Sequence, residues 1–152
     1  MPDLLNTLIM NSYLIDGPVT PEMIASEIRR LGSRKDTGGH SIFLGQVRED
    51  PSDGRRVTAI EYSAYEGMIS TEVEKIKDII RGEFSDVLEI VIVHSIGRVR
   101  AGELSLFVLV SAGHRDHATK ACRQTVELIK EKLPVWKREI LDDNTHKWQK
   151  NS

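Results

Sequence analysis

The chain has little cysteine, few aromatic residues and almost no net charge, and two of these shortages exclude whole classes of site. Its 152 residues include one cysteine, Cys122, so an internal disulfide, a cysteine-rich metal site and a two-thiol sulfur relay are all excluded. The formal net charge is −2, whereas general nucleic-acid binding depends on many lysine and arginine contacts to phosphate. We therefore expect no nucleic-acid partner.

The sequence also lacks long apolar runs and glycine-rich motifs. No segment approaches the roughly 20 apolar residues of a membrane-spanning helix. Residues 1–10 are mildly apolar but have no basic start, and Asn6, Asn11 and Asp16 interrupt the segment, so we predict no signal peptide, no membrane association and a cytoplasmic location. The glycine-rich fingerprint of nucleotide-binding α/β domains is absent as well.

What remains is the composition of an ordinary globular domain, with 39% hydrophobic and 29% charged residues. A chain of this length fits one domain, residues 1–152, and buries roughly two-thirds of its unfolded surface on folding.

Three amphipathic helices are predicted. Thr20-Pro21-Glu22 is a typical helix start, with a capping hydroxyl, a proline in the first turn and an acid near the positive end of the helix dipole. The second helix covers residues 66–84 and the third residues 116–133. The expected buried faces are Ile24, Ile28 and Leu31; Ile69, Val73, Ile76 and Ile80; and Ala118, Cys122, Val126, Ile129 and Leu133.

Strand patterns alternate with these helices. Residues 41–47 and 57–65 are predicted to pair as a hairpin through the turn at 49–56, and residues 87–99 pair with 104–111 through 100–103. The tail from Trp136 to Trp148 is expected to add a short edge hairpin or to cover a site. The predicted fold class is α+β, with helices packed on a mostly antiparallel sheet.

The segment Lys130–Glu139 carries the clearest functional signal. Pro134 must stop the charged third helix, so the following residues leave it in an extended conformation. Lys130 and Lys137 can then converge from two different elements, beside Trp136, which we expect, like Phe43, to be core or pocket wall. Residues 115–139 hold seven basic and four acidic side chains, a balance that favours a compact anionic ligand.

His114 and Arg115 stand at the entrance of the third helix, where free amides and the helix dipole favour an anion. The alternative is that His114 only caps the helix and Arg115 faces water. His114 and His117 have no carboxylate companion at a suitable sequence spacing, so we predict no metal site. Cys122 lies on the apolar stripe and is expected in the core.

Five stretches occur in the order and spacing of one known family. They are Gly45-Gln46-Val47-Arg48, Glu61-Tyr62 with Tyr65-Glu66-Gly67-Met68, His94-Ser95-Ile96-Gly97, Ser111-Ala112-Gly113-His114-Arg115, and Pro134-Val135-Trp136-Lys137-Arg138-Glu139. Together they extend from about Ser41 to Trp148. The sequence thereby resembles the MoaE family, the large, catalytic subunits of molybdopterin synthase.

The resemblance implies a hammerhead-like α+β fold and a sulfurtransferase without a cofactor. The family transfers two sulfurs to cyclic pyranopterin monophosphate, and a small ubiquitin-like partner donates them from a thiocarboxylated Gly-Gly tail. The residues that the resemblance marks are Lys130 and Lys137 as catalytic, and Gln46, Val47, Arg48, His114, Arg115, Arg138 and Glu139 as substrate-binding. Gln46 stands where some members carry lysine. The alternatives are solvated lysines at a helix end and an ordinary Arg138–Glu139 surface pair.

Helix geometry adds a prediction about assembly. His114 and Lys130 are separated by sixteen residues of one helix, or roughly 24 Å. One chain cannot bring both to one small substrate, so we predict a homodimer with two composite sites and, with the small partner, a heterotetramer. The competing interpretations are a non-catalytic α+β module that binds a phosphorylated metabolite and an RNA-binding domain that uses the basic helix.

Overall fold

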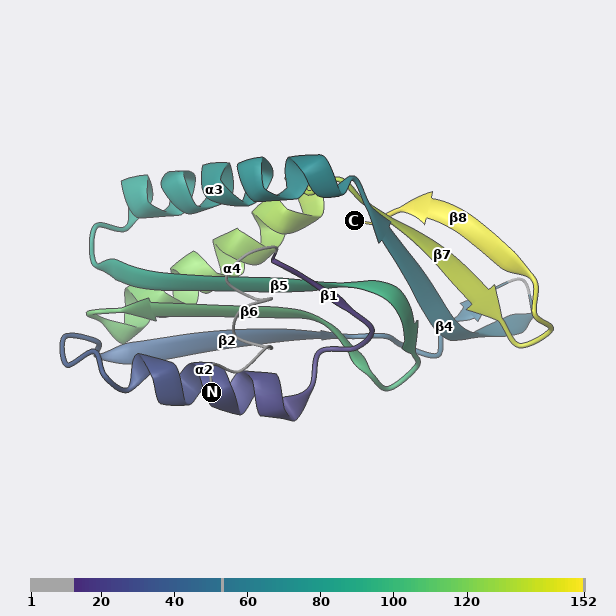
Figure 1. Cartoon of the computed structure of the whole chain (residues 1–152), viewed down its shortest axis with the longest axis horizontal. Helices are drawn as coiled ribbons and strands as arrows, with labels where there is room; N and C mark the ends of the chain where they lie inside the picture. The colour runs from purple at the N-terminus through teal and green to yellow at the C-terminus, as the bar shows by residue number, and fades with distance from the viewer. Residues whose placement is uncertain (1–12, 53, 152) are drawn as a thin grey trace.

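A computed structural model describes residues 13–52 and 54–151, which form helices on an eight-stranded sheet, as the sequence predicts (Figure 1). The strand order is β2-β6-β5-β4-β7-β8, with β1 beside β5 and β3 beside β4. All pairs are antiparallel except β1–β5. The elements are β1 (Leu14–Asp16), α2 (Pro21–Leu31), β2 (Gly39–Gln46), β3 (Pro51–Ser52), β4 (Arg55–Ala64), α3 (Glu66–Glu83), β5 (Val87–Arg100), β6 (Leu104–Ala112), α4 (Arg115–Lys132), β7 (Val135–Leu141) and β8 (His146–Lys150).

The centre of the sheet is buried on both faces. Side chains alternate along β5, so Ile90 and Ile92 join the core cluster under α3 and α4, while Val91 and Val93 join the cluster under α2. This two-sided burial accounts for the nearly continuous apolar sequence of β5 and β6. Figure 1 shows α4 passing behind these strands.

The helices and the second hairpin agree with the sequence. α3 and α4 begin and end within one residue of the predicted bounds, and Ile69, Val73, Ile76 and Ile80 are all buried. The Thr20 hydroxyl accepts a 3.3 Å hydrogen bond from the amide of Met23 at the start of α2. β5 and β6 pair through the turn at 101–103, as predicted.

The predicted hairpin between residues 41–47 and 57–65 is wrong. β2 pairs with β6, with Ser41 opposite Val110, and β4 pairs instead with β5 and β7. The apolar β5–β6 hairpin occupies the centre, so β2 completes one side of it and the chain then crosses to the other side to form β4. Only the two residues of β3 make a local hairpin with β4.

The buried face of α2 also differs from the prediction. The buried residues are Met23, Glu27 and Leu31, whereas Ile24 is half-buried and Ile28 is 45% exposed. A carboxylate occupies an inward position because Arg30 neutralises it: Arg30 Nε lies 2.6 Å from Glu27 Oε2. Apolar periodicity alone does not detect such a position.

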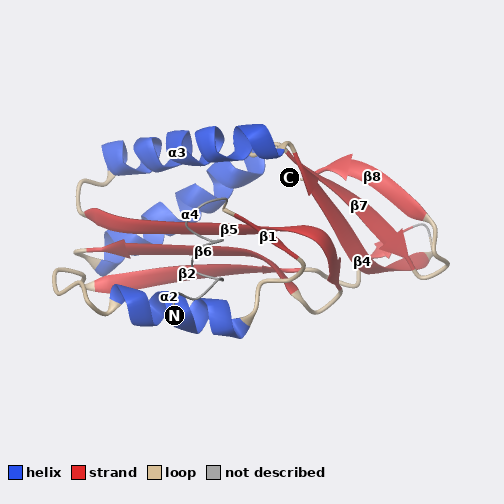
Figure 2. Ribbon diagram, viewed as in Figure 1, coloured by secondary structure: helices blue, strands red, loops and turns tan. Residues whose placement is uncertain are grey.

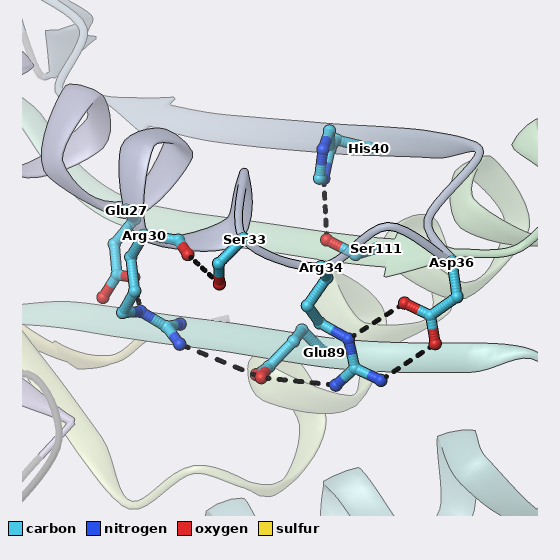
Figure 3. Close-up of polar contacts among 8 residues, drawn as sticks. All are labelled: Glu27, Arg30, Ser33, Arg34, Asp36, His40, Glu89 and Ser111. Atoms are coloured by element: carbon cyan, nitrogen blue, oxygen red, sulfur yellow. Dashed lines mark hydrogen bonds and ion pairs between the residues drawn. The ribbon is translucent and has the colours of Figure 1, made fainter.

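Polar contacts attach α2 and the following loop to the sheet (Figure 3). Arg30 and Arg34 each approach Glu89 Oε1 on β5 to 3.8 Å. His40 Nδ1 lies 2.7 Å from the Ser111 hydroxyl across the β2–β6 pair.

The strands β4, β7 and β8 form a ribbon that extends away from the helices (Figure 2). Of the two predictions for the tail, the edge hairpin is confirmed, since β8 pairs with β7 at the end of the sheet. None of the described helices combines the length and apolar character that a membrane crossing requires.

Candidate functional site

Lys130 and Lys137 lie on either side of Pro134, at the junction where α4 ends and β7 begins. Leu133 caps α4 in an extended conformation, and Pro134 accepts a 3.1 Å hydrogen bond from the amide of Tyr65, which fixes the turn against the start of α3. Lys137 then stands opposite Tyr62 on β4. Both lysine side chains are partly exposed.

The structure brings the charges of the two lysines close enough to interact. Burial lowers the pKa of Lys130, the positive charge of Lys137 lowers it further, and Glu127 opposes the shift. A lysine with a lowered pKa reaches its neutral form more easily and can act as a base, an acid or an amine nucleophile. The junction therefore has the electrostatic character expected of a site for an anion and proton transfer.

His94 is a neighbour of this junction that the site prediction missed. It is 1% exposed, its ring packs edge-on against Tyr62 at 5.1 Å between centroids, and its Nδ1 lies 2.7 Å from the Ser95 carbonyl. Burial lowers the pKa of His94 to about 4, and the charge of Lys130 adds to the shift. His94 is thus a neutral histidine. Its sequence signals were a histidine that directly follows the apolar run Ile90–Val93 and its place in the family stretch His94-Ser95-Ile96-Gly97.

The tail of the chain reaches this histidine. The side-chain nitrogen of Asn151 lies 3.1 Å from His94 Nε2, and the amide of Asn151 donates to the Val135 carbonyl at 3.1 Å. Asn151 is buried although the whole of β8 before it is exposed. Asn151, at the end of the described chain, therefore lies beside the place where α4 ends and β7 begins, between Lys130 and Lys137, which we call the lysine junction.

Alternation along β7 separates the predicted residues between two faces of the ribbon. Lys137 and Glu139 share one face, where Gln149 Nε2 donates to Glu139 Oε1 at 2.6 Å. Arg138 lies on the other face, where it pairs with Glu61 and stacks on the Trp148 ring at 5.2 Å. The structure brings Glu139 to the face of Lys137 and keeps Arg138 away from it.

The carboxylate of Glu61 is held between two guanidinium groups. Arg98 Nη2 donates to it at 2.8 Å, and Arg138 supplies the second contact. The hydrogen bond from Arg98, with that from Arg138, lowers the pKa of Glu61 against the opposing effect of burial. Arg138 is therefore engaged in a structural ion-pair cluster within this chain.

The predicted residues of β2 and its end differ in accessibility. Val47 is 2% exposed and belongs to the core, and its backbone pairs with Gly102 and Glu103 at the β5–β6 turn. Gln46 and Arg48 are exposed, and the Arg48 side chain contacts Asp50 at 3.3 Å. Val47 thus anchors the segment, whereas Arg48 extends a cation into solvent.

The opposite end of α4 holds the second predicted cationic group. His114 and Arg115 line a pocket of about 470 Å³ with Gly38, Gly113 and Asp116. Gly38 is required there, because a Cβ atom would lie 2.1 Å from the Gly113 carbonyl oxygen. Both side chains are exposed, and His114 is the residue that caps α4, without a side-chain capping bond of its own.

The prediction that His114 and His117 have no carboxylate companion is wrong for His117, which contacts Asp86. His117 does have a carboxylate companion, since its Nδ1 lies 2.7 Å from Asp86 Oδ1, and Asp86 Oδ2 accepts a 3.1 Å hydrogen bond from the His114 amide. The two residues are 31 positions apart, so sequence spacing could not reveal the contact. Within the described part of the chain, no three histidine, cysteine or acidic residues converge as a metal site would require.

One chain does not unite the two cationic groups. α4 is an unbroken helix of 18 residues, so His114 and Arg115 stand at one end and Lys130 near the other, roughly 24 Å apart. Cys122, midway along α4, is buried as predicted, and burial raises the pKa of its thiol.

A second surface feature adjoins the lysine junction. Tyr65, Met68 and Trp136 are exposed apolar side chains that line a pocket of about 500 Å³ together with Ser63, Ala64 and Pro134. Trp136 is therefore pocket wall rather than core. We call this feature the Trp136 pocket.

Comparison with known proteins finds a matching family and relatives of similar sequence. The family described as "MoaE protein" matches residues 18–132. A "Molybdopterin synthase catalytic subunit" of Thermoplasma volcanium is 34% identical over 92% of this chain and 99% of its own length. That of Pyrococcus abyssi is 42% identical over 74% of this chain and 75% of its own.

Solved structures have the same fold. Molybdopterin synthase from Staphylococcus aureus superposes with a TM-score of 0.79 at 31% identity, covering 90% of this chain and 94% of that one. A Helicobacter pylori chain, from a "protein-protein complex of subunit 1 and 2 of Molybdopterin-converting factor", shares the fold with a TM-score of 0.74 at 22% identity, over 90% of this chain and 88% of its own.

Proposed function

The chain belongs to the MoaE family, and we propose from this premise that Lys130 and Lys137 perform the chemistry of a molybdopterin synthase. The protein is a catalytic subunit of that enzyme, which is a sulfurtransferase of molybdenum cofactor biosynthesis. Sulfur passes from the thiocarboxylated tail of a small ubiquitin-like subunit to cyclic pyranopterin monophosphate. One thiocarboxylate carries one sulfur, so two carriers serve each dithiolene.

The lowered pKa of Lys130 beside Lys137 is the observation that carries the assignment of roles. Lys130 handles proton transfer at the reacting carbon or at the thioester, since burial and the charge of Lys137 lower its pKa and make the neutral amine easier to reach. Lys137 holds the substrate anion. The terminal carbonyl of the carrier tail lies near Lys130, with the tail extended along the junction.

The Trp136 pocket suits the small partner. Exposed apolar patches rimmed by polar residues mark interaction surfaces, and Tyr65, Met68 and Trp136 form such a patch beside the lysine junction. Trp136 lies on the face of β7 opposite to Lys137, so the tail of a carrier domain seated there passes around Pro134 to reach Lys130.

Sulfur-transfer assays with thiocarboxylated partner test these roles. Lys130→Ala and Lys137→Ala each reduce turnover by about 10²–10⁴-fold, the usual contribution of a positioned proton-transfer group or anion ligand. Lys132→Ala, an exposed lysine of the same helix, is the matched control and keeps normal turnover. Binding of the pterin without turnover in the unmodified protein would favour the non-catalytic module instead.

The remaining cations require a second copy of the chain. In a homodimer, Arg115 of one copy completes the site that holds Lys130 and Lys137 of the other, and two small partners make a heterotetramer. Random mixing of Arg115→Ala and Lys130→Ala chains makes half of the dimers mixed, each with one intact site, so about a quarter of normal activity returns. No recovery would contradict shared sites.

A further inference from the structure

A buried polar contact beside the lysine junction has no role in the chemistry described so far. Asn151 directly follows β8, whose residues are all exposed, yet it is only 6% exposed itself. Its side-chain nitrogen lies 3.1 Å from Nε2 of His94, whose ring is also buried. A buried polar group needs a partner to offset the loss of water, so each of these side chains depends on the other.

The surroundings of the His94 ring determine which nitrogen carries the proton. Nδ1 lies 2.7 Å from the carbonyl oxygen of Ser95, which can only accept a hydrogen bond, so Nδ1 carries the hydrogen. In the neutral ring Nε2 is then a bare acceptor, and the side-chain amide of Asn151 donates to it. The two contacts together fix the tautomer and the orientation of the ring.

The backbone of Asn151 ties this contact to the start of β7. Its amide donates to the Val135 carbonyl at 3.1 Å, one residue after the proline that ends α4. Its side chain reaches His94 in the middle of β5, so one residue links β5 to the segment between α4 and β7. The charge of Lys130 acts on the His94 ring, since it lowers the pKa of that ring further. The link therefore lies near the amine of Lys130.

We propose that Asn151 is a positioning residue, which together with the neutral His94 ring forms a water-excluding wall beside Lys130. The proposal deepens the proposed function and rests on it for the role of Lys130 in proton transfer. A wall without charge suits that role, because an anion there would hold the lysine in its protonated form and a cation would repel it. Burial is the largest cause of the lowered pKa of Lys130, which agrees with such a wall.

The other groups around the ring are polar but neutral, except on the side of the lysines. Tyr62 of β4 packs edge-on against His94 at 5.1 Å between centroids, and its hydroxyl donates to Ser105 of β6 at 3.1 Å. The charged groups on this side are Lys130 of α4, which acts on the ring, and Lys137 of β7, which stands opposite Tyr62. Asn151 thus completes the neutral part of the surroundings.

The titration of Lys130 tests the wall without substrate or partner. NMR of its side-chain resonances, assigned with Lys130→Arg, gives its pKa in the full chain. Asn151→Leu keeps a side chain of similar size but leaves His94 Nε2 without its donor, so water should enter and the pKa of Lys130 should rise by about one unit. His146→Gln, on exposed β8, is the matched control and should leave that pKa unchanged.

An unchanged Lys130 pKa in Asn151→Leu would overturn the proposal. Asn151→Ala removes the same donor and replaces the leucine variant if that one does not fold.

A double variant shows whether Asn151 acts through His94. When both partners of a buried hydrogen bond become apolar, no polar group remains to attract water. His94→Leu combined with Asn151→Leu should therefore bring the Lys130 pKa back below that of Asn151→Leu alone. A pKa as high as in the single variant, or higher, would mean that Asn151 does not act through the ring and would overturn the proposed link.

Turnover separates this proposal from the proposed function. At pH 7 with thiocarboxylated partner, kcat of Asn151→Leu should fall about 10-fold, as the neutral fraction of Lys130 does, while KM for the pterin changes less than about twofold. A raised pKa with normal turnover would refute proton transfer by Lys130 and leave the wall standing. An unchanged pKa, with Lys130→Ala inactive, would refute the wall alone.

Discussion

The buried histidine beside the lysine junction makes the stability of the protein depend on pH. His94 is 1% exposed and its pKa falls from 6.5 to about 4 in the folded chain. Between these values the unfolded chain binds the proton and the folded chain does not, so stability is present above pH 6.5 and is lost as the pH falls towards 4. A difference of 2.5 pKa units corresponds to about 3 kcal/mol of unfolding free energy.

Urea unfolding at a series of pH values measures this loss. The protein concentration must stay fixed, since self-association of the folded chain, where it occurs, would add to the apparent stability. The unmodified chain should lose most of the 3 kcal/mol between pH 7 and pH 4.5, and His94→Gln should remove most of this pH dependence while costing about 1–2 kcal/mol at pH 7 through lost packing on Tyr62.

An exposed histidine supplies the control for that experiment. His146→Gln on β8 should keep the pH dependence of the unmodified chain, since its ring is open to solvent. The reasoning is refuted if the curves of His94→Gln and the unmodified chain run parallel from pH 7 to pH 4.5.

Three further outcomes follow from other parts of the structure. Arg30→Ala leaves the buried Glu27 carboxylate without its ion pair and should lower the unfolding free energy by about 1–3 kcal/mol in chemical denaturation, and adding Glu27→Leu should recover part of the loss. Lys130→Met removes a cation whose pKa burial lowers, so thermal melts at pH 7 should show no destabilisation although sulfur transfer is lost. Cys122→Ala should keep turnover within about twofold, since the thiol packs in the core, and cost about 1 kcal/mol in denaturant titrations.

The sequence predicted the helices and their ends well, because apolar spacing and proline act on neighbouring residues of the chain. The spacing of Ile69, Val73, Ile76 and Ile80 is enough to define α3, and Pro134 is enough to end α4. The placement of Lys130 and Lys137 near each other follows from the same proline.

What the sequence could not predict depends on contacts between distant segments. The β2–β6 pairing joins residues about 70 positions apart, and no turn signal specifies it. Glu27 is buried only because Arg30 pairs with it, and Asp86 reaches His117 only in the folded chain. The opposite faces of Lys137 and Arg138 could have been inferred from strand alternation, once residues 135–141 were recognised as a strand.

Because side chains alternate along β7, the position of Lys137 depends on the register of this strand against β4. Lys137 faces the junction while its neighbours Trp136 and Arg138 serve the opposite surface, so sliding the strand by a single position against β4 would exchange an amine for an indole or a guanidinium. The pairing with β8 and the seat of Asn151 beside His94 both resist such sliding. The C-terminal hairpin thus fixes the register of β7 against β4. Deleting β8 should reduce sulfur transfer before it lowers the stability of the fold.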